Sequence, residues 1–336
     1  MKLPADRVSQ LRTFYQGRQV CVTGGAGFIG GHLIDALVSL GASISVIDDL
    51  SNSNLENLAP LIEMEPDRIR FVHGSILDDA ALQDACEGAK TVFHLAALGS
   101  VPKSVEEPQR TWSVNTTGTL RVLEAARNAP AERVVFAASS SAYGDQPELP
   151  KVETQMPQVL SPYGASKLAG EHLLATWAHC YGLSTVGLRY FNIFGPRQSA
   201  DSAYAAVIAA FAKNLSNGKA PLIFGDGTQT RDFTFVDNAV LATLLAGASG
   251  KPLKGEIMNI GTGRRVSVTD LAILMAERFN QPQLRPVYQP ARPGDVKHSV
   301  ADITKARTLL AYEPFASLEQ GLSETIEWFK RSLAKA

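Results

Sequence analysis

Cysteine is scarce in this sequence. The 336 residues include three cysteines, Cys21, Cys86 and Cys180, which are odd in number, widely spaced and set in apolar surroundings. That pattern is typical of reduced core residues, and it excludes a disulfide framework. The six histidines form no cluster with carboxylates at the spacing of metal ligands, so the sequence predicts no metal site.

The sequence also lacks an excess of charge of either sign. With 32 basic and 33 acidic residues, the net charge of −1 provides no basic field for a nucleic acid or an anionic membrane. No apolar run reaches membrane-spanning length, and residues 1–15 lack the apolar core of a signal peptide. We therefore expect a cytoplasmic protein with no nucleic-acid partner and no membrane partner.

What the sequence does contain is an alternation of apolar strands and amphipathic helices over its first two hundred residues. Near-continuous apolar runs are typical of strands buried on both faces of a parallel sheet. The expected strands are 19–23, 43–48, 69–73, 91–95, 133–139 and 184–190, and the expected helices are 28–40, 78–86, 108–127 and 163–181. This pattern predicts an α/β fold of the Rossmann type, with a doubly wound parallel sheet.

The last third of the chain has a different pattern, with shorter strands between its helices. Strands are expected near 221–224, 230–235 and 256–260, and helices near 203–215, 237–248 and 268–279. We expect residues 1–190 to form the Rossmann domain. Residues 191–336 are expected to form mainly a smaller mixed α/β lobe that completes the ligand cleft, with segments that interleave between the two.

A glycine-rich turn, Thr-Gly-Gly-Ala-Gly-Phe-Ile-Gly, joins the first expected strand to the first helix. Gly24, Gly27 and Gly30 are each separated by two residues. Glycine permits the tight turn, the close approach of phosphate oxygens and the packing of the helix against the strand. The free N–H groups where the helix begins, at Phe28 and Ile29, then face a pyrophosphate. The motif predicts a dinucleotide site.

An acidic residue, Asp48, ends the second expected strand. An acid about 20 residues after the glycines is placed to accept hydrogen bonds from the hydroxyls of the adenosine ribose. Asp48 and its neighbour Asp49 would repel the 2′-phosphate of NADP, so NAD is the expected cofactor. The alternative interpretation of Asp48 is an ordinary loop acid.

Tyr163 and Lys167 form the second chemical pattern, because residues four apart lie on the same side of a helix. A lysine ammonium beside a phenol favours the phenolate, as does the positive nicotinamide of oxidised cofactor. We therefore expect a lowered pKa for Tyr163, which suits a general base. The alternative is an aromatic and a lysine that share a helix face by chance.

Four motifs together resemble the extended short-chain dehydrogenase/reductase family, and specifically its nucleotide-sugar 4-epimerases. They are the glycine turn, Ser-Ser-Ser-Ala-Tyr-Gly, Ser-Pro-Tyr-Gly-Ala-Ser-Lys and Leu-Arg-Tyr-Phe-Asn-Ile-Phe-Gly-Pro-Arg. The resemblance runs from about residue 18 to residue 329. It implies an isomerase with bound NAD, a UDP-sugar substrate and a homodimer.

The resemblance also implies roles for individual residues. Tyr163 matches the catalytic base, Lys167 its partner on the nicotinamide ribose, and Ser139 the assisting hydroxyl, with Ser140 as its alternative. In the implied reaction, the hydroxyl on carbon 4 loses its proton to Tyr163 while a hydride moves to the nicotinamide. The resulting 4-keto sugar turns, and the hydride returns to its opposite face.

Further contacts follow from the same resemblance. The additional residues expected at the cofactor are Ser75, Ile76, Ala96, Ala97 and Tyr190, together with Tyr163 and Lys167. The residues expected at the UDP-sugar are Gly99, Ser100, Ser139, Ser141, Tyr163, Asn192, Arg231, Arg292, Asp295 and Ser299. Ser75 departs from the pattern, because many relatives place an aspartate there, and this weakens the expected contact with adenine.

Substrate choice depends on Ser299, which stands where epimerases restricted to UDP-glucose and UDP-galactose tend to carry tyrosine. A small residue leaves room for an N-acetyl group, so we expect UDP-N-acetylglucosamine and UDP-N-acetylgalactosamine, with their uronic acids or UDP-glucose and UDP-galactose as further substrates. The alternatives are a UDP-uronate decarboxylase and a non-catalytic NAD-responsive binding module. A 4,6-dehydratase is disfavoured because Ser140 and Ser141 replace its Asp-Glu pair.

Overall fold

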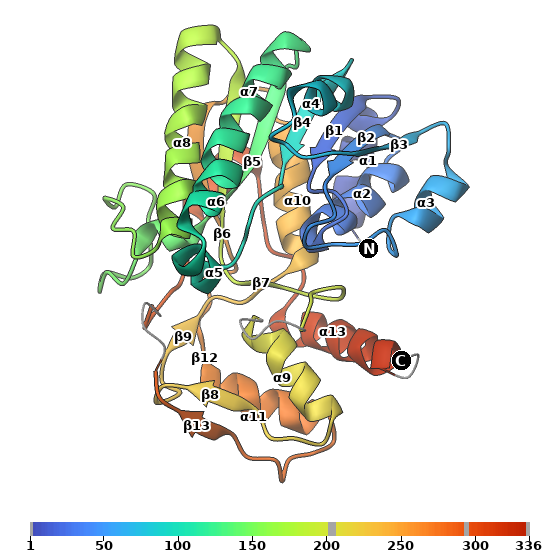
Figure 1. Cartoon of the computed structure of the whole chain (residues 1–336). Coiled ribbons are helices and arrows are strands. Elements are labelled where there is room, and N and C mark those ends of the chain that lie inside the picture. The colour runs from blue at the N-terminus through green and yellow to red at the C-terminus, as the bar shows by residue number, and fades with distance from the viewer. Residues whose placement is uncertain (1–2, 201–205, 292–295, 334–336) are drawn as a thin grey trace.

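A parallel sheet forms the centre of the molecule. The computed structural model describes residues 3–200, 206–291 and 296–333. Within them, seven strands are ordered β11-β6-β5-β4-β1-β2-β3 (Figure 1). They are β1 (Gln19–Thr23), β2 (Ser43–Asp48), β3 (Ile69–His73), β4 (Thr91–His94), β5 (Arg133–Ser139), β6 (Ser184–Tyr190) and β11 (Lys254–Ile260). The expected Rossmann-type fold is confirmed.

The order of the strands reverses between β1 and β4. The chain proceeds outward from β1 through β2 to β3, and it then returns to the other side of β1 with β4, β5 and β6. Thr23 at the end of β1 consequently pairs with Ile47 of β2 and with His94 of β4. Such a reversal opens a crevice at the carboxyl ends of the strands, which is where ligands bind in this class of fold.

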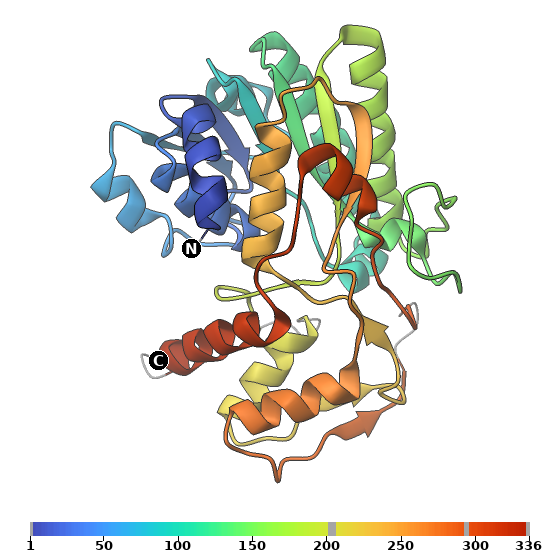
Figure 2. The same ribbon diagram turned by 180° about the vertical axis from the view of Figure 1, so that it is seen from behind.

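Helices cover both faces of the sheet, as the two opposite views show (Figures 1 and 2). One face carries α4 (Asp79–Cys86), α7 (Gly118–Asn128) and α8 (Pro162–Tyr181), and the other carries α1 (Ala5–Tyr15), α2 (Phe28–Ser39) and α10 (Val236–Gly247). Short helices α3 (Ala59–Met64) and α5 (Val101–Glu106) lie in connections. Among the described residues, no helix combines the length and the apolar character needed to cross a membrane.

The helix expected over 108–127 is interrupted. It consists of α6 (Pro108–Trp112), a π-helical turn η1 (Ser113–Thr117) and α7. A π turn inserts one extra residue into the helical repeat, and such turns are frequent at functional sites. Here the turn brings Ser113 and Val114 into the wall of the main cavity.

The smaller lobe consists of short strands and three helices, α9 (Val207–Ser216), α11 (Val268–Arg278) and α13 (Leu318–Leu333). Its strand pairs are β8 (Leu222–Phe224) with β13 (Val287–Gln289), and β9 (Thr230–Arg231) with β12 (Val266–Ser267). β10 (Thr234–Phe235) pairs with β7 (Ile193–Phe194). The strand expected over 230–235 is therefore two strands in different sheets.

Two elements after residue 190 return to the large sheet. β11 pairs with β6, and α10 packs against α2 and β5. α12 (Thr304–Leu310) contacts both β11 and α10. The buried Arg133 guanidinium holds the end of α10, because it donates hydrogen bonds to the carbonyl oxygens of Ala246, Gly247 and Ser249 at 3.3, 3.1 and 2.6 Å. A cation there also opposes the negative end of the helix dipole.

Candidate active site

A cavity of about 960 Å³ opens at the carboxyl ends of the strands. Its walls come from the glycine turn after β1 and from residues that end or follow β2 to β6. The smaller lobe closes it with Arg231, Val296 and Ser299. Residues from distant parts of the chain thus meet around one space large enough for two ligands of nucleotide size.

The glycine turn lies against this cavity and has no room for side chains. A Cβ atom on Gly30 would lie 2.2 Å from the carbonyl oxygen of Gly24, and one on Gly24 would lie 2.6 Å from the amide nitrogen of Ala96. Gly24 also has a φ of +71°, a conformation that glycine adopts without strain. Gly24, Gly27 and Gly30 therefore present only backbone to the cavity, which suits the close approach of phosphate oxygens, and Phe28 and Ile29 at the start of α2 also line it.

Asp48 lies in the cavity wall at the end of β2, but it also binds the protein itself. Its carboxylate accepts hydrogen bonds from the amides of Ala26 and Leu50 at 3.0 and 2.9 Å, and from the hydroxyl of Ser53 at 3.0 Å. These bonds use three of about four acceptor positions on a carboxylate. A ribose hydroxyl must use the remaining position or share one with Ser53.

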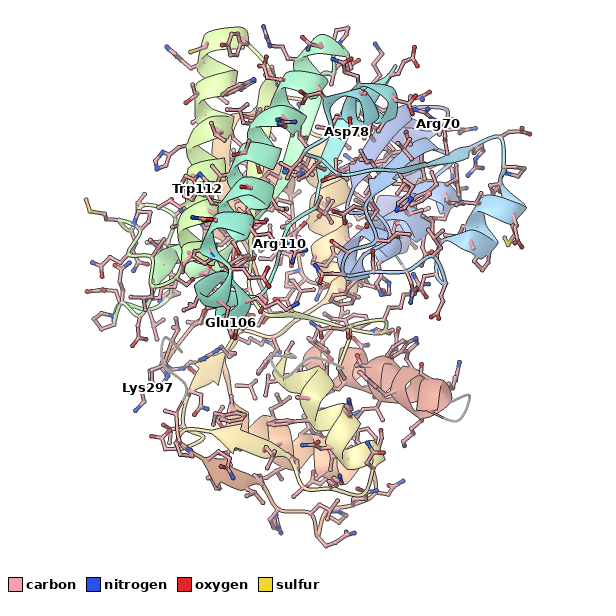
Figure 3. The ribbon with its side chains drawn as sticks, in the orientation of Figure 1. Arg70, Asp78, Glu106, Arg110, Trp112 and Lys297 are labelled. Carbon is pink, nitrogen blue, oxygen red and sulfur yellow. The ribbon has the colours of Figure 1, made fainter. Side chains whose placement is uncertain are left out.

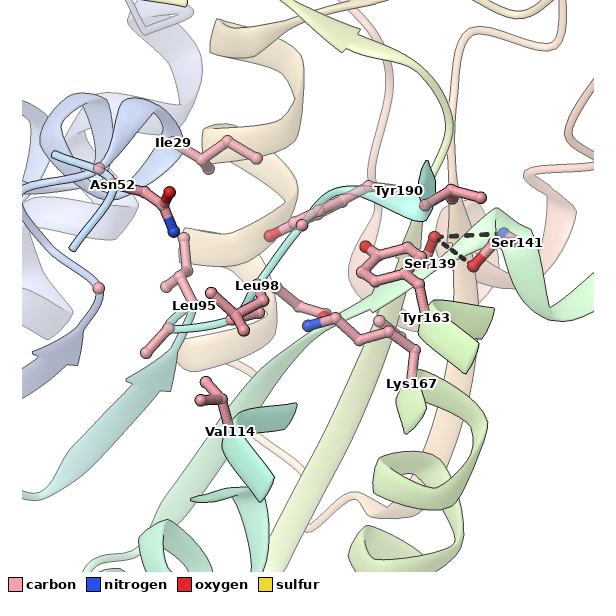
Figure 4. A pocket seen from close by; sticks show the side chains of 18 of the residues that line it. Ile29, Asn52, Leu95, Leu98, Val114, Ser139, Ser141, Tyr163, Lys167 and Tyr190 are labelled. Atoms are coloured by element: carbon pink, nitrogen blue, oxygen red, sulfur yellow. Dashed lines mark hydrogen bonds between the residues drawn. The ribbon is translucent and has the colours of Figure 1, made fainter. Parts of the chain in front are cut away.

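Tyr163 and Lys167 project from the first turns of α8 into the same part of the cavity, with Ser139 beside Tyr163 (Figure 4). Ser161 caps the helix by accepting a hydrogen bond from the amide of Gly164. The Lys167 ammonium donates to the carbonyl oxygen of Ala137 at 2.9 Å and lies 4.8 Å from the centre of the Phe136 ring.

Burial dominates the titration of both side chains. It raises the pKa of Tyr163, and the hydrogen bond with Ser139 opposes that rise. Burial lowers the pKa of Lys167 to about 7, because the charged ammonium loses its hydration. The lowered pKa expected for Tyr163 is therefore wrong for the protein chain by itself, because burial raises this pKa and Ser139, not Lys167, opposes the rise.

The serine run after β5 is held by hydrogen bonds within itself. Ser139 is the last residue of β5, and its hydroxyl oxygen accepts hydrogen bonds from the hydroxyl and the amide of Ser141 at 2.9 and 3.2 Å (Figure 4). Ser140 begins a short 3₁₀ helix and also lines the cavity. Of the two candidate hydroxyls, Ser139 is the one that contacts Tyr163.

The smaller lobe contributes Asn192, Arg231 and Ser299 to the cavity. Asn192 has a φ of +38° and lies two residues after the end of β6. The Arg231 guanidinium donates to the carbonyl oxygens of Thr230 and Lys297, at 3.0 and 3.1 Å. The amide of Ser299 donates to the carbonyl oxygen of Thr230 at 3.0 Å, so the strand that carries Arg231 also holds Ser299.

The structure places most of the expected site residues in the one cavity. The lining includes Gly24, Gly27, Phe28, Ile29, Gly30, Asp48, Asp49, Ser75, Ile76, Ala96, Ala97, Gly99, Ser139, Ser140, Ser141, Tyr163, Lys167, Tyr190, Asn192, Arg231 and Ser299. Ser100 is not part of the lining, and its hydroxyl accepts a hydrogen bond from the amide of Lys103. Arg292 and Asp295 lie outside the described residues. The ligand contacts of all these residues stay predictions.

Two expected site residues have hydroxyl groups that form hydrogen bonds within the protein. The Tyr190 hydroxyl lies 2.6 Å from that of Thr243, and burial raises the pKa of Tyr190 to about 12. The Ser75 hydroxyl oxygen accepts a hydrogen bond from the amide of Leu77 at 3.2 Å. Tyr190 therefore offers the cavity its ring rather than its hydroxyl.

The cavity also includes residues that sequence reasoning missed. They are Asn52, Leu98, Val114, Lys151 and Gln198, among others. Asn52 follows Asp48 closely, and its position beside a strand end was a usable signal. Val114 is brought in by the π turn, and Lys151 by the pairing of its backbone with the segment after Ser299. No local pattern marks either of these residues.

The residues present fit a dinucleotide. Gly24, Gly27 and Gly30 line the cavity without side chains, the start of α2 lies beside them, and an acidic side chain stands at the end of β2. Lys167 supplies a buried amine on the opposite side of the cavity. The glycine turn suits the phosphates, the acidic side chain suits the hydroxyls of one ribose, and Lys167 suits the second ribose.

Comparison with known proteins decides the family. Residues 20–261 match the model of the NAD dependent epimerase/dehydratase family. The chain belongs to this family. NAD is accordingly its cofactor. The expected resemblance to nucleotide-sugar 4-epimerases and the expected enzyme class, an isomerase that uses NAD, are confirmed.

Relatives and solved structures match over almost the whole chain. A UDP-glucose 4-epimerase of Mycolicibacterium smegmatis is 38% identical over 92% of this chain and 97% of its own. A UDP-N-acetylglucosamine 4-epimerase of Methanobrevibacter ruminantium, in complex with UDP-N-acetylmuramic acid, is 36% identical with a TM-score of 0.88 and covers 94% of this chain and 99% of its own. A UDP-glucose 4-epimerase of Thermus thermophilus, in complex with NAD, is 33% identical with a TM-score of 0.82 over 93% and 99% of the two chains.

Proposed function

We propose that the protein is a UDP-sugar 4-epimerase that prefers UDP-N-acetylglucosamine and UDP-N-acetylgalactosamine. The observation that carries the preference is the small side chain of Ser299 in the cavity wall. Ser299 is 8% exposed, and its backbone is hydrogen-bonded to Thr230. The position of this small side chain in the cavity wall is therefore fixed by the fold. The similarity to the Methanobrevibacter enzyme supports the same choice. Uronic acids of these sugars, UDP-glucose and UDP-galactose are proposed as slower substrates.

The chain's own residues provide the acid and base chemistry. Bound NAD would supply the hydride acceptor and donor needed at carbon 4 of the sugar. Tyr163 removes the proton of the hydroxyl on carbon 4 and later gives one back, and the Ser139 hydroxyl holds the phenol in place. Lys167 is placed to hold the nicotinamide ribose. Asn192 and Arg231 are placed to hold the diphosphate, so that the sugar can turn while the nucleotide stays.

The experiment is proton NMR of the purified protein with UDP-N-acetylglucosamine and, separately, with UDP-glucose, each with and without added NAD. We expect the galacto anomer to appear faster from the N-acetylated substrate. Faster conversion of UDP-glucose would support 4-epimerase activity but would reject the proposed role of Ser299 in substrate preference. Conversion of neither, with carbon dioxide released from a UDP-uronate, would identify a decarboxylase instead.

A homodimer in the cytoplasm completes the proposal. Trp112 on α6 is 49% exposed (Figure 3). Tyr181 at the end of α8 is 52% exposed, and Val105 in α5 is 65% exposed. Large apolar side chains on neighbouring helices are typical of a surface that a second copy covers. Light scattering after size exclusion tests this, with a mass near 72 kDa expected, twice the 36.0 kDa of one chain.

A further inference from the structure

His94, at the end of β4, takes no part in the chemistry proposed above, yet it lies between the two halves of the site. The residue is 1% exposed, and its ring lies 5.4 Å from the ring of Phe136. Its Nδ1 atom is 2.8 Å from the hydroxyl of Thr23, directly before the glycine turn. Its Nε2 atom is 2.9 Å from the hydroxyl of Thr119 on α7.

The neighbouring hydrogen bonds determine which nitrogen carries the proton. The Thr119 hydroxyl donates to the carbonyl oxygen of Asn115 at 2.6 Å, so it must accept from Nε2–H of His94. The Thr23 hydroxyl oxygen accepts from the amide of Ala96 at 3.2 Å and donates its own proton to Nδ1. His94 is therefore a neutral imidazole with its proton on Nε2. Burial agrees with this, because it lowers the pKa of His94 to about 3.

Asn115 continues these bonds to the catalytic helix. Its amide group accepts from the amide of Leu98 at 2.8 Å and donates to the carbonyl oxygen of Leu98 at 3.2 Å. It also donates to the Ser166 hydroxyl at 3.0 Å, which donates to the carbonyl oxygen of Tyr163 at 2.8 Å. The backbone of residues 96–98 is thus held at one end by Thr23 and at the other by Asn115, with His94 between the two anchors.

We propose that His94 is a positioning residue, which fixes the position of the backbone of residues 96–98 relative to α8, the helix that carries Tyr163. Residues 96–98 line the cavity between the glycine turn and Tyr163, so their placement sets where the sugar lies relative to the base. The kinetic test of this inference rests on the proposed function, because it measures epimerisation. Both ring nitrogens are hydrogen-bonded, so a ring without nitrogens leaves the hydroxyls of Thr23 and Thr119 without their histidine partner. We expect both anchors to loosen as a result.

The first test compares His94→Phe, Thr119→Val and the double variant with the unchanged protein in epimerisation of UDP-N-acetylglucosamine. A misplacement of about 1 Å costs on the order of 100-fold in rate, so we expect kcat to fall about 10- to 100-fold while KM changes less than about threefold. The double variant should be no slower than His94→Phe, because both changes break the same chain of bonds. Additive losses or an unchanged kcat would overturn the proposal.

Two further variants separate positioning from a loss of folding. His94→Gln keeps an amide donor toward Thr119, and it should recover a large part of kcat relative to His94→Phe. His73→Gln changes an exposed histidine at the end of β3, outside these bonds, and should leave kcat unchanged. If His94→Phe lowers the melting temperature while kcat at 20 °C is retained, the role is structural and the proposal is wrong.

The second test does not depend on the reaction. Hydrogen exchange measured by mass spectrometry reports the amides of Ala96 and Leu98, which donate hydrogen bonds to Thr23 and Asn115. Under the proposal, His94 supports both of these bonds. We expect these amides to exchange at least about tenfold faster in His94→Phe, with α8 unchanged beyond its first turn. Unchanged exchange would reject the inference even if epimerisation is observed. Faster exchange without epimerisation of any UDP-sugar would reject the proposed function and keep the inference.

Discussion

The two walls of the cavity are built in different ways. The wall proposed for the cofactor consists of strand ends from one sheet, where parallel register places Thr23 beside Ile47 and His94. The wall proposed for the sugar nucleotide consists of two- and three-residue strands and of loops. There Ser299 depends on one hydrogen bond to Thr230, and Lys151 on pairing with Val300 and Asp302.

This difference predicts where the protein tolerates change. Backbone packing in the cofactor wall leaves no space for a methyl group at several glycines. The wall of the smaller lobe contains side chains of several sizes on short segments, so a change of side chain there alters the shape of the cavity without altering the sheet. We expect substitutions in the first wall to abolish binding or rate, and substitutions in the second to change selectivity.

The largest effect is expected where the two walls meet, at Tyr163. Tyr163→Phe removes the hydroxyl and keeps the ring, so kcat should fall about 10²- to 10⁴-fold, the usual contribution of a general base. NAD affinity, measured by calorimetry, should change less than about threefold, since the ring of Tyr163 and every other residue expected at the cofactor are kept. Tyr181→Phe on the exposed end of the same helix is the control. Retention of kcat in Tyr163→Phe would assign the base elsewhere.

The cofactor wall is tested by Gly30→Ala. The added Cβ would lie 2.2 Å from the carbonyl oxygen of Gly24, so the turn or the helix must shift. We expect NAD affinity to weaken about 10- to 100-fold, which corresponds to ~1–3 kcal/mol of overpacking. Gly250→Ala meets no atom within 4 Å and should bind NAD normally. Equal NAD affinity in the two variants would show that the turn does not contact the cofactor.

The wall of the smaller lobe is tested by Ser299→Tyr. The larger ring should fill the space beside Ser299, so kcat/KM for UDP-N-acetylglucosamine should fall about tenfold, within the range for steric discrimination in a pocket. Activity with UDP-glucose should be retained, and Ser299→Ala should keep the original preference. A parallel loss with both substrates would mean that Ser299 does not set selectivity.

A separate effect, on folding and not on the reaction, concerns stability against pH. Lys167 has a pKa of about 7 in the fold and an ordinary pKa near 10.5 when unfolded. Between these values the unfolded chain binds more protons, so unfolding free energy should rise with pH. In the absence of NAD, the stability of the unchanged protein relative to Lys167→Met should therefore increase from pH 7 to about pH 10.5 in urea titrations. A stability difference between the two proteins that does not change with pH would contradict the lowered pKa of the buried Lys167 amine.

Sequence patterns predicted the parallel sheet closely, because each buried strand is a short apolar run and five of the six expected strands have the observed bounds. The sixth, expected over 91–95, ends one residue earlier at His94. The π turn between Ser113 and Thr117 was not predicted, since the surrounding sequence has an ordinary helical pattern. The raised pKa of Tyr163 was also missed, because burial is not visible in the spacing of two residues.

Local chemistry alone determined the glycine turn, the pairing of Tyr163 with Lys167 on one helix face and the acid at the end of β2. Each depends on residues a few positions apart, whose geometry a helix, strand or turn defines. Tertiary structure decided that β11 and α10 return to the large sheet, and that His94 joins Thr23 to Thr119. These contacts join residues distant in the chain, so they depend on packing and burial, which no local pattern specifies.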